Sequence, residues 1–477
     1  MKRDESKNIN ENKILYYRNV TSFLLLTLFL GLALIPELAI NYFFKDELKV
    51  QPSKLTRLLT ISRFPWVINP IFGMITDFYP IFGYKKKIYI LFCGLIFCSV
   101  WLILGLLKIN SLLTVICFFV SNVTCCFSTV LSQAIMIEIG GKMDEQEEEE
   151  NREKKKQTNK LITYNAIISN IGILIGSYLK GELIQLFNIR IVFIITSCLG
   201  LLPLISAIIL KEFNDENDEN LISSILNTSV KSNENEQTLI DYMFQKKIIV
   251  PFIIFLIVTT IPITFDTYFY YEIHYLNFKP VDFSKINVIY QVVTLIVIYL
   301  YDKLDCNTTK CSFFFIKFIS TGSGFFFYLI YNEYYEKFNL NPFYIILFVT
   351  IIQFCLNQIF NIMIYKISAK LTIKKFEETV FSTLTTTINV GYILGLLYSS
   401  ILTDVTGITR KDFSNFGKFI IVTNIVSVFP TIFILITPSS YFEPKIIKEI
   451  TKNEENKKEF EKKIEIKEND DEEELLM

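Results

Sequence analysis

Apolar and charged residues are segregated along this chain instead of being interspersed. Residues 23–44, 112–139 and 248–271 carry a single charged side chain each, whereas residues 143–160 and 211–247 are dense in Glu, Lys and Asn. A helix needs an apolar run of about 20 residues to cross the hydrocarbon core of a bilayer, and only helices or closed barrels can span it. The runs lack the alternation of barrel strands. This pattern predicts an all-α membrane protein with many spans.

Twelve segments are long and apolar enough to be transmembrane helices. They are predicted at residues 20–44, 55–77, 88–107, 111–140, 158–182, 190–211, 248–273, 282–302, 308–331, 341–366, 376–403 and 414–437. The chain then divides into a cytosolic N-terminal arm (1–19), a six-helix half (20–211), a cytosolic linker (212–247), a second six-helix half (248–437) and a charged cytosolic tail (438–477).

Basic residues are concentrated in alternate loops. One set of loops holds the cluster at residues 85–87 and further Lys and Arg at residues 152–156, 246–247 and 370–375, and the opposite set is shorter and poorer in both. Loops rich in Lys and Arg remain in the cytosol, so we expect both termini to be cytosolic. We favour the plasma membrane as the location, with an organelle membrane as the alternative.

The two halves repeat each other. IPELAINYFFKDEL in the first half matches the residue types of IPITFDTYFYYEIH in the second. The pattern Asn-x-Gly-x-x-x-Gly also occurs in each half, and its glycines, which let helices approach closely, are Gly172 and Gly176, then Gly391 and Gly395. Two six-helix halves joined by a long loop predict the fold of a major-facilitator transporter, with substrate bound near the midplane between them.

Ionisable side chains inside the predicted spans are candidates for function, because each costs roughly 2.5–3.5 kcal/mol at the centre of a membrane helix. They are Glu37, Arg63, Glu138, Asp266, Lys317 and Lys366. Helices 1, 4, 7 and 10 line the cavity of a major-facilitator fold, which favours Glu37, Glu138, Asp266 and Lys366.

Several of these charges have plainer interpretations. Glu138 and Lys366 lie near the predicted cytosolic ends, where they could pair with each other or extend to the interface. Glu37 could be an interfacial residue at the outer end, and Lys317 is expected at the periphery of the second half.

The remaining composition excludes several classes of function. A formal net charge of −1 gives no bias toward nucleic acid. Most of the nine cysteines lie within apolar runs, where buried thiols are the usual role. His274 is the single histidine, and there is no HExxH or Ser/His/Asp constellation. We therefore expect no metal, no cofactor and no enzymatic activity.

The stretch FPWVINPIFGMITDFYPIFGYKKKIYIL carries charges at the predicted cytosolic end of helix 2. Its Gly-x-x-x-Asp, glycine and basic residues resemble the gating motif of the major-facilitator superfamily. The resemblance implies a latch that forms and breaks as the halves rock, made of Gly73, Asp77, Gly83, Lys85, Lys86 and Lys87, with Asp302 as the weaker counterpart in the second half. Alternatively, the lysines only set the orientation.

The same stretch is more specific than the general motif. Pro-Trp-x-x-x-Pro-x-x-Gly-x-x-x-Asp followed by PIFGY closely resembles the folate–biopterin transporter family. LAINYFFKDELKVQPSKL is similar to the first loop of that family, TTIPITFDTYFYYEIHYLNF to its seventh helix, and FEETVFSTLTTTINVG to its signature at helix 11. The chain departs from the family at Asn69, Thr129 and Gln133, where a Lys and two acids are usual.

The resemblance implies a secondary-active carrier of folate or a related pterin, coupled to protons and working by alternating access. A carboxylate such as Glu37 or Asp266 can accept the paired N–H groups of a pterin, or take up the coupling proton, and Arg63 suits the carboxylates of a glutamate tail. The alternatives are a carrier of another organic solute, such as S-adenosylmethionine or an amino-acid-like molecule, and a sensor that kept the fold. We expect a monomer in the lipid bilayer.

Overall fold

The computed structural model describes residues 2–79, 81–148, 156–212, 244–303, 309–337, 339–371 and 377–442. These residues form helices and their connections, with one isolated β-bridge between Ile81 and Tyr84. Most of the predicted linker (212–247) and of the predicted tail (438–477) lies outside the described residues.

The first half contains nine α-helices in the described residues, several of which are pieces of one span. They are α1 (Lys2–Leu32), α2 (Pro36–Tyr42), α3 (Pro52–Arg63), α4 (Asn69–Phe78), α5 (Lys87–Leu106), α6 (Ser111–Glu148), α7 (Lys156–Leu186), α8 (Ile189–Cys198) and α9 (Leu201–Ile209). A π-helical turn, Phe43–Glu47, extends α2, and a 3-10 turn, Phe64–Val67, separates α3 from α4.

The second half repeats this arrangement. Its α-helices in the described residues are α11 (Lys246–Thr259), α12 (Phe265–His274), α13 (Pro280–Lys303), α14 (Lys310–Gly322), α15 (Phe327–Tyr331), α16 (Tyr334–Lys337), α17 (Pro342–Leu371), α18 (Glu377–Val405), α19 (Phe416–Val428) and α20 (Ile432–Ile436).

Ten helices of the described chain are long and apolar enough to cross a membrane. Two further predicted spans are each divided into a pair of shorter helices, α3 with α4 and α11 with α12. Together they account for the twelve predicted spans, and the all-α membrane fold is confirmed.

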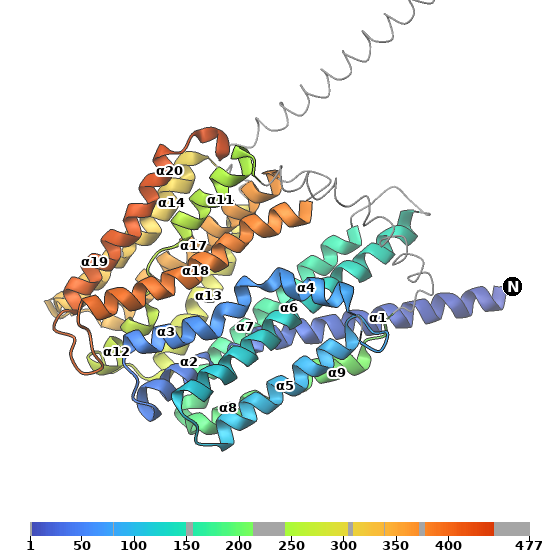
Figure 1. Cartoon of the computed structure of the whole chain (residues 1–477), viewed down its shortest axis with the longest axis horizontal. Helices are drawn as coiled ribbons and strands as arrows, with labels where there is room; N and C mark the ends of the chain where they lie inside the picture. The colour runs from blue at the N-terminus through green and yellow to red at the C-terminus, as the bar shows by residue number, and fades with distance from the viewer. Residues whose placement is uncertain are drawn as a thin grey trace, which may run out of the picture.

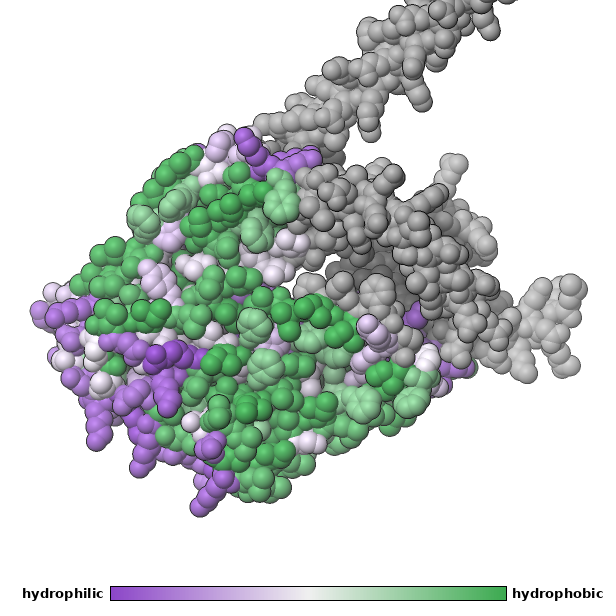
Figure 2. Space-filling model, in the orientation of Figure 1, coloured by the Kyte–Doolittle hydropathy of each residue, from purple (hydrophilic) through white to green (hydrophobic). Residues whose placement is uncertain are grey.

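The surface of the bundle is apolar and much of its interior is polar. Ile175, Tyr178 and Ile319 are exposed, whereas Ser22 and Ser206 are fully buried and hydrogen-bond each other at 2.8 Å. Figure 2 shows hydrophobic residues over the middle of the visible face and hydrophilic ones toward its two ends, most densely at the left. An apolar exterior around a hydrogen-bonded interior suits a protein whose surrounding solvent is lipid.

The two repeats are built on the same contact between helices. In the first half α7 packs on α1 through Gly172 and Gly31, and a Cβ atom on Gly172 would lie 3.0 Å from the Cα of Gly31. In the second half α18 packs on α11, and a Cβ atom on Gly391 would overlap the side chain of Thr259. The glycines therefore set how closely the helices of each pair approach.

The seventh span is interrupted where Gly395 approaches it. Residues 260–264 are not helical and contain Pro262, which has no N–H to donate. The backbone N–H of Ile263 donates instead to the carbonyl of Gly395 on α18, at 3.2 Å. A Cβ atom at Gly395 would overlap the carbonyl oxygen of Ile261. The break is thus held open by a backbone contact between two helices.

Helices of the two halves pack against each other in two main pairs, α7 with α13 and α3 with α18. We call the end of the bundle that carries residues 48–51 and 406–415 the loop end, and the end that carries the N-terminus the terminal end. In Figure 1 the ribbons of the two halves run together at the loop end and diverge toward the terminal end, where the N label stands.

Side chains join the halves at the loop end. Arg57 on α3 pairs with Asp404 on α18 at 3.2 Å, and the hydroxyl of Ser400 donates to the carbonyl of Ser53 at 2.8 Å. The hydroxyl of Tyr270 donates to the carbonyl of Val50, also at 2.8 Å. These contacts close the loop end between the halves.

At the terminal end the basic cluster of residues 85–87 meets Glu212. The backbone N–H groups of Lys85 and Lys86 donate to the Glu212 carboxylate at 2.8 and 2.6 Å, and that of Lys87 also donates to it. These groups lie at the N-terminus of α5, where the helix dipole favours an anion. Glu212 therefore fixes the end of the first half onto the loop that precedes α5.

Candidate functional site

A cluster of opposite charges lies at the point where the first span bends. Glu37 is in the first turn of α2, just after residues 33–35 interrupt the span, and Arg63 is the last residue of α3 before the chain turns at Pro65. The Arg63 guanidinium lies 3.4 Å from one Glu37 carboxylate oxygen, and the Lys180 ammonium on α7 lies 3.5 Å from the other. One carboxylate thus faces two cations.

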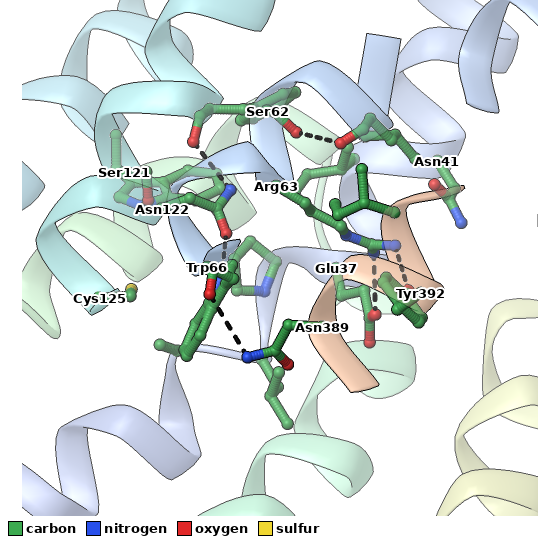
Figure 3. A pocket seen from close by; sticks show the side chains of 18 residues that line it. Glu37, Asn41, Ser62, Arg63, Trp66, Ser121, Asn122, Cys125, Asn389 and Tyr392 are labelled. Atoms are coloured by element: carbon green, nitrogen blue, oxygen red, sulfur yellow. Dashed lines mark hydrogen bonds and ion pairs between the residues drawn. The ribbon is translucent and has the colours of Figure 1, made fainter. Parts of the chain in front are cut away.

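Tyr392 connects this cluster to the second half. Arg63 donates to the Tyr392 hydroxyl at 2.5 Å, and the guanidinium lies over the Tyr392 ring, 5.6 Å from its centroid. Figure 3 shows Arg63 reaching both Glu37 and Tyr392, with α18 supplying the tyrosine. The contact joins α3 to α18 in the middle of the molecule.

Glu37, Arg63 and Tyr392 stand between two cavities, because all three line both. The first cavity, about 340 Å³, lies mainly in the first half and is lined by Trp66, by Trp101 on α5, and by side chains of α2, α3, α6 and α18. The second cavity, about 500 Å³, lies mainly in the second half. Both volumes are in the range of sites for small organic molecules.

The first cavity combines indole rings with amides. The indole N–H of Trp66 donates to the Asn122 side chain at 3.0 Å, and the Asn389 amide donates to the carbonyl of Trp66 at 3.4 Å (Figure 3). Aromatic faces beside fixed donors and acceptors suit a flat heterocycle, which can stack and hydrogen-bond at the same time.

The second cavity brings further charges to the same space. Asp266 is in the first turn of α12, directly after the break in the seventh span, and only 3% of it is exposed. Its Oδ2 atom has no hydrogen-bond partner among the described residues. Glu272, one and a half turns later, is also buried and lines the cavity. Asp266 therefore holds, in the lining of the second cavity, a buried carboxylate oxygen whose hydrogen-bonding capacity is unused among the described residues.

Lys317 corrects one expectation from the sequence. It is not at the periphery of the second half, because its side chain is 2% exposed and lines the second cavity. Its ammonium lies 3.2 Å from the Asn357 side-chain oxygen and 4.5 Å from the centroid of the Phe360 ring. The expectation was wrong because FFFIKFIS offers apolar neighbours on every side, so the direction of the lysine cannot be read from its spacing.

The structure brings some of the predicted site residues together around the second cavity and leaves others away from it. Glu37, Arg63 and Asp266 line the second cavity, whereas Lys366 lines neither cavity and its ammonium lies over the Tyr301 ring, 4.8 Å from the centroid. The side chains of Glu138, Asp77 and Asp302 lie outside the described residues. The roles of all these residues therefore stay predictions.

The three positions at which the chain departs from the resembled family lie away from both cavities. Asn69 accepts a hydrogen bond from the Cys126 thiol at 2.9 Å, Thr129 donates to the carbonyl of Cys125 at 2.9 Å, and Gln133 is exposed. None of the three lines either cavity. Their replacement leaves the charges that surround the cavities intact.

Sequence reasoning missed Lys180, Glu272 and Tyr392. A signal for Lys180 was present, because it follows Gly176 by four residues and so shares the helix face that packs on α1. Glu272 and Tyr392 lie within polar and aromatic stretches that carry no comparable signal. Among the described residues, no group of three or more His, Cys, Asp or Glu is arranged to hold a metal.

Comparison with known proteins places this arrangement in a family. The model of the BT1 family matches residues 30–460. The chain belongs to the BT1 family. Its relatives include the folate–biopterin transporter of a Synechocystis species, 23% identical over 429 residues that cover 89% of this chain and 82% of the relative.

Solved structures support the same conclusion for the fold. The nucleoside transporter NupG superposes with a TM-score of 0.63 at 14% identity, covering 87% of this chain and 98% of its own. The xylose transporter XylE from E. coli superposes with a TM-score of 0.58, covering 88% and 96%. This BT1 protein therefore has the major-facilitator fold and is a multi-pass membrane transporter, not an enzyme. The resemblance stated from its motifs is confirmed.

Proposed function

We propose that this BT1 protein carries folate or a related pterin across the membrane by alternating access, coupled to protons. The observation that carries the proposal is the cluster of Glu37, Arg63 and Lys180 at the junction of two cavities, one mainly in the first half and one mainly in the second. The names of its relatives, which include a folate–biopterin transporter and folate transporters, point to the same substrate class.

Recognition of a pterin fits the residues at this junction. A pterin ring is flat, carries adjacent N–H donors and exposes ring acceptors, so it needs a carboxylate, an aromatic face and a donor close together. Glu37 or the free oxygen of Asp266 supplies the carboxylate, and Trp66 supplies the face. Arg63 has donors in a planar fork that suits ring acceptors.

The difference between the two ends of the bundle supports the proposal of alternating access. The loop end is closed by Arg57 with Asp404 and by Ser400 with Ser53. With both termini in the cytosol, as the loop charges predict, this end faces outward, and the arrangement corresponds to the state that receives or releases substrate on the cytosolic side. The plasma membrane stays our favoured location, and the bilayer and one small molecule are the partners that this function needs.

Proton coupling is assigned to the carboxylates at the junction. Asp266 is buried, faces the second cavity and has an oxygen without a partner among the described residues, so that protonation there would not break an existing hydrogen bond. Glu37 is committed to two cations and would have to release them first. Asp266 is therefore the first candidate and Glu37 the second.

The test is uptake of labelled folate and labelled biopterin into proteoliposomes, with an imposed gradient of pH. We expect accumulation that is larger when the outside is more acidic, and loss of that pH dependence in Asp266→Asn. Asp412→Asn is the matched control, because the hydrogen bond from the Ser414 backbone N–H holds the pKa of this exposed carboxyl below its usual range. Asp412 then stays ionised from about pH 5 to about pH 8, so its removal should leave the pH dependence unchanged.

The outcomes separate the parts of the proposal. Absence of uptake of either compound by correctly inserted protein would contradict the substrate class. Uptake that does not depend on the pH gradient would contradict proton coupling and leave the substrate class standing. The alternative, a carrier of another organic solute, would be recognised by accumulation of S-adenosylmethionine or an amino acid in the same vesicles, and a sensor by saturable binding without accumulation.

A further inference from the structure

Lys317 is a buried cation that faces the second cavity without an anionic partner. Its side chain is 2% exposed, and its ammonium contacts the Asn357 side-chain oxygen and the Phe360 ring. None of the ion pairs between described residues includes it. An amide dipole and a ring face compensate an ammonium only in part.

The other two cations of the cavity differ from Lys317 in this respect. Arg63 and Lys180 both pair with the Glu37 carboxylate, and Arg63 also donates to Tyr392. Their charge is thus already neutralised in part, and their donors are partly used. No acid of the described structure pairs with Lys317, so its ammonium is left to interact with an anion that enters the cavity.

Neutral polar side chains line the second cavity together with Lys317. Asn357, Asn361 and Gln353 on α17 line the same cavity as Lys317 on α14. Amide groups can hydrogen-bond a carboxylate without competing for the ammonium as an acid would. An unneutralised cation among amides is the arrangement expected for an anion site, and it would be costly to retain in a membrane without a use.

We propose that Lys317 binds a carboxylate of the transported substrate and so selects pterins that carry an acidic tail. This inference rests on the proposed function and deepens it. The tail lies in the second cavity toward α14, and the ring lies at the junction formed by Glu37, Arg63 and Tyr392. The assignment replaces Arg63, which the sequence suggested for the tail, because Arg63 is already engaged by Glu37 and Tyr392.

Three variants test the role of Lys317 with two substrates that differ in the tail. Uptake is measured as a function of concentration for folate, which has carboxylates, and for biopterin, which has none. We expect Lys317→Met to lower the ratio kcat/KM for folate by about tenfold to a hundredfold, the value of a charge-assisted contact, while biopterin stays within about twofold. Lys317→Arg should recover part of the folate uptake.

Asn357→Asp gives a second route to the same result. It leaves the lysine in place and adds a carboxylate at the position now 3.2 Å from the ammonium. The new carboxylate then pairs with the lysine and neutralises it, so folate uptake should fall and biopterin uptake should persist. Lys310→Met is the matched control, because Lys310 lies on the same helix, is half-buried, and donates to the Leu435 carbonyl without lining the cavity.

Binding measurements separate this proposal from the proposed function. Thermal stabilisation of purified protein is recorded with folate, with biopterin and with p-aminobenzoylglutamate, which has the acidic tail and no pterin. Stabilisation of the wild type but not of Lys317→Met by p-aminobenzoylglutamate supports the carboxylate site even if no pterin is transported. Equal stabilisation of both proteins, no stabilisation of the wild type by any acidic probe, or a parallel loss of folate and biopterin uptake overturns it.

Discussion

Removal of the Glu37 carboxylate should destabilise the transporter because it leaves two cations without their anion. In Glu37→Gln, Arg63 keeps its hydrogen bond to Tyr392, but Lys180, whose side chain is 7% exposed, keeps no ion pair in the described structure. The variant tests whether the cluster stabilises the bend of the first span as a unit.

The magnitude follows from the distances and the exposure. Two unit charges about 3.5 Å apart attract each other by roughly 5 kcal/mol at an effective dielectric constant of about 20, before desolvation is counted. Breaking a fully buried pair costs about 3–5 kcal/mol, and an exposed pair contributes about 1 kcal/mol or less. The Glu37 side chain is 40% exposed to its cavity, so water screens it in part. We expect the free energy of unfolding to fall by about 2 kcal/mol, between these limits.

The assay is the apparent melting temperature of detergent-solubilised protein, followed by size-exclusion chromatography after heating. Glu37→Gln should melt several degrees below the wild type. Adding Lys180→Met should return part of the loss, because it removes the cation that was left unpaired, and the two substitutions should therefore be non-additive. A double variant whose loss equals the sum of the single losses, or Glu37→Gln at the melting temperature of the wild type, would refute the reasoning.

Three further predictions concern the contacts between helices. Gly395→Val should prevent close packing of α18 on the break at residues 260–264, since even a Cβ atom overlaps the Ile261 carbonyl oxygen, and the yield of monodisperse protein should fall sharply; normal yield would contradict this. Cysteines at Ser53 and Ser400, which are in hydrogen-bond contact, should cross-link under oxidation and block uptake, with reductant restoring it and neither single cysteine variant responding. Arg57→Gln should change the melting temperature by little, because both partners of its ion pair are about half exposed and such pairs contribute about 1 kcal/mol or less; a fall of many degrees would contradict this estimate.

The twelve spans could be predicted because run length and hydropathy report directly on the thickness of the bilayer. The repeat could be predicted because two glycine pairs recur, and these glycines do lie at α1 with α7 and at α11 with α18. The interruption of the seventh span was not predicted. Pro262 signals a weakened helix, but the contact of Ile263 with Gly395 depends on how two distant helices pack.

The site was predicted less completely than the fold for a related reason. Charge at membrane depth identifies Glu37, Arg63 and Asp266 as candidates, since each is costly to insert. It does not say which charges neutralise one another, because that depends on the rotation of each helix about its own axis. Only the structure shows that Lys180 lies beside Glu37. Only the structure shows that Lys317 lines the cavity without pairing with a described acid.

The charges around the second cavity also bear on its electrical behaviour. Among the described residues its lining holds three acids and three bases, which are Glu37, Asp266 and Glu272 with Arg63, Lys180 and Lys317. With all six ionised they sum to zero. Moving one elementary charge through a membrane potential involves about 2.3 kcal/mol per 100 mV, so we expect the return of an empty cavity in which these six groups are ionised to depend little on voltage. Any current that accompanies transport then measures the charge of the cargo and of its protons.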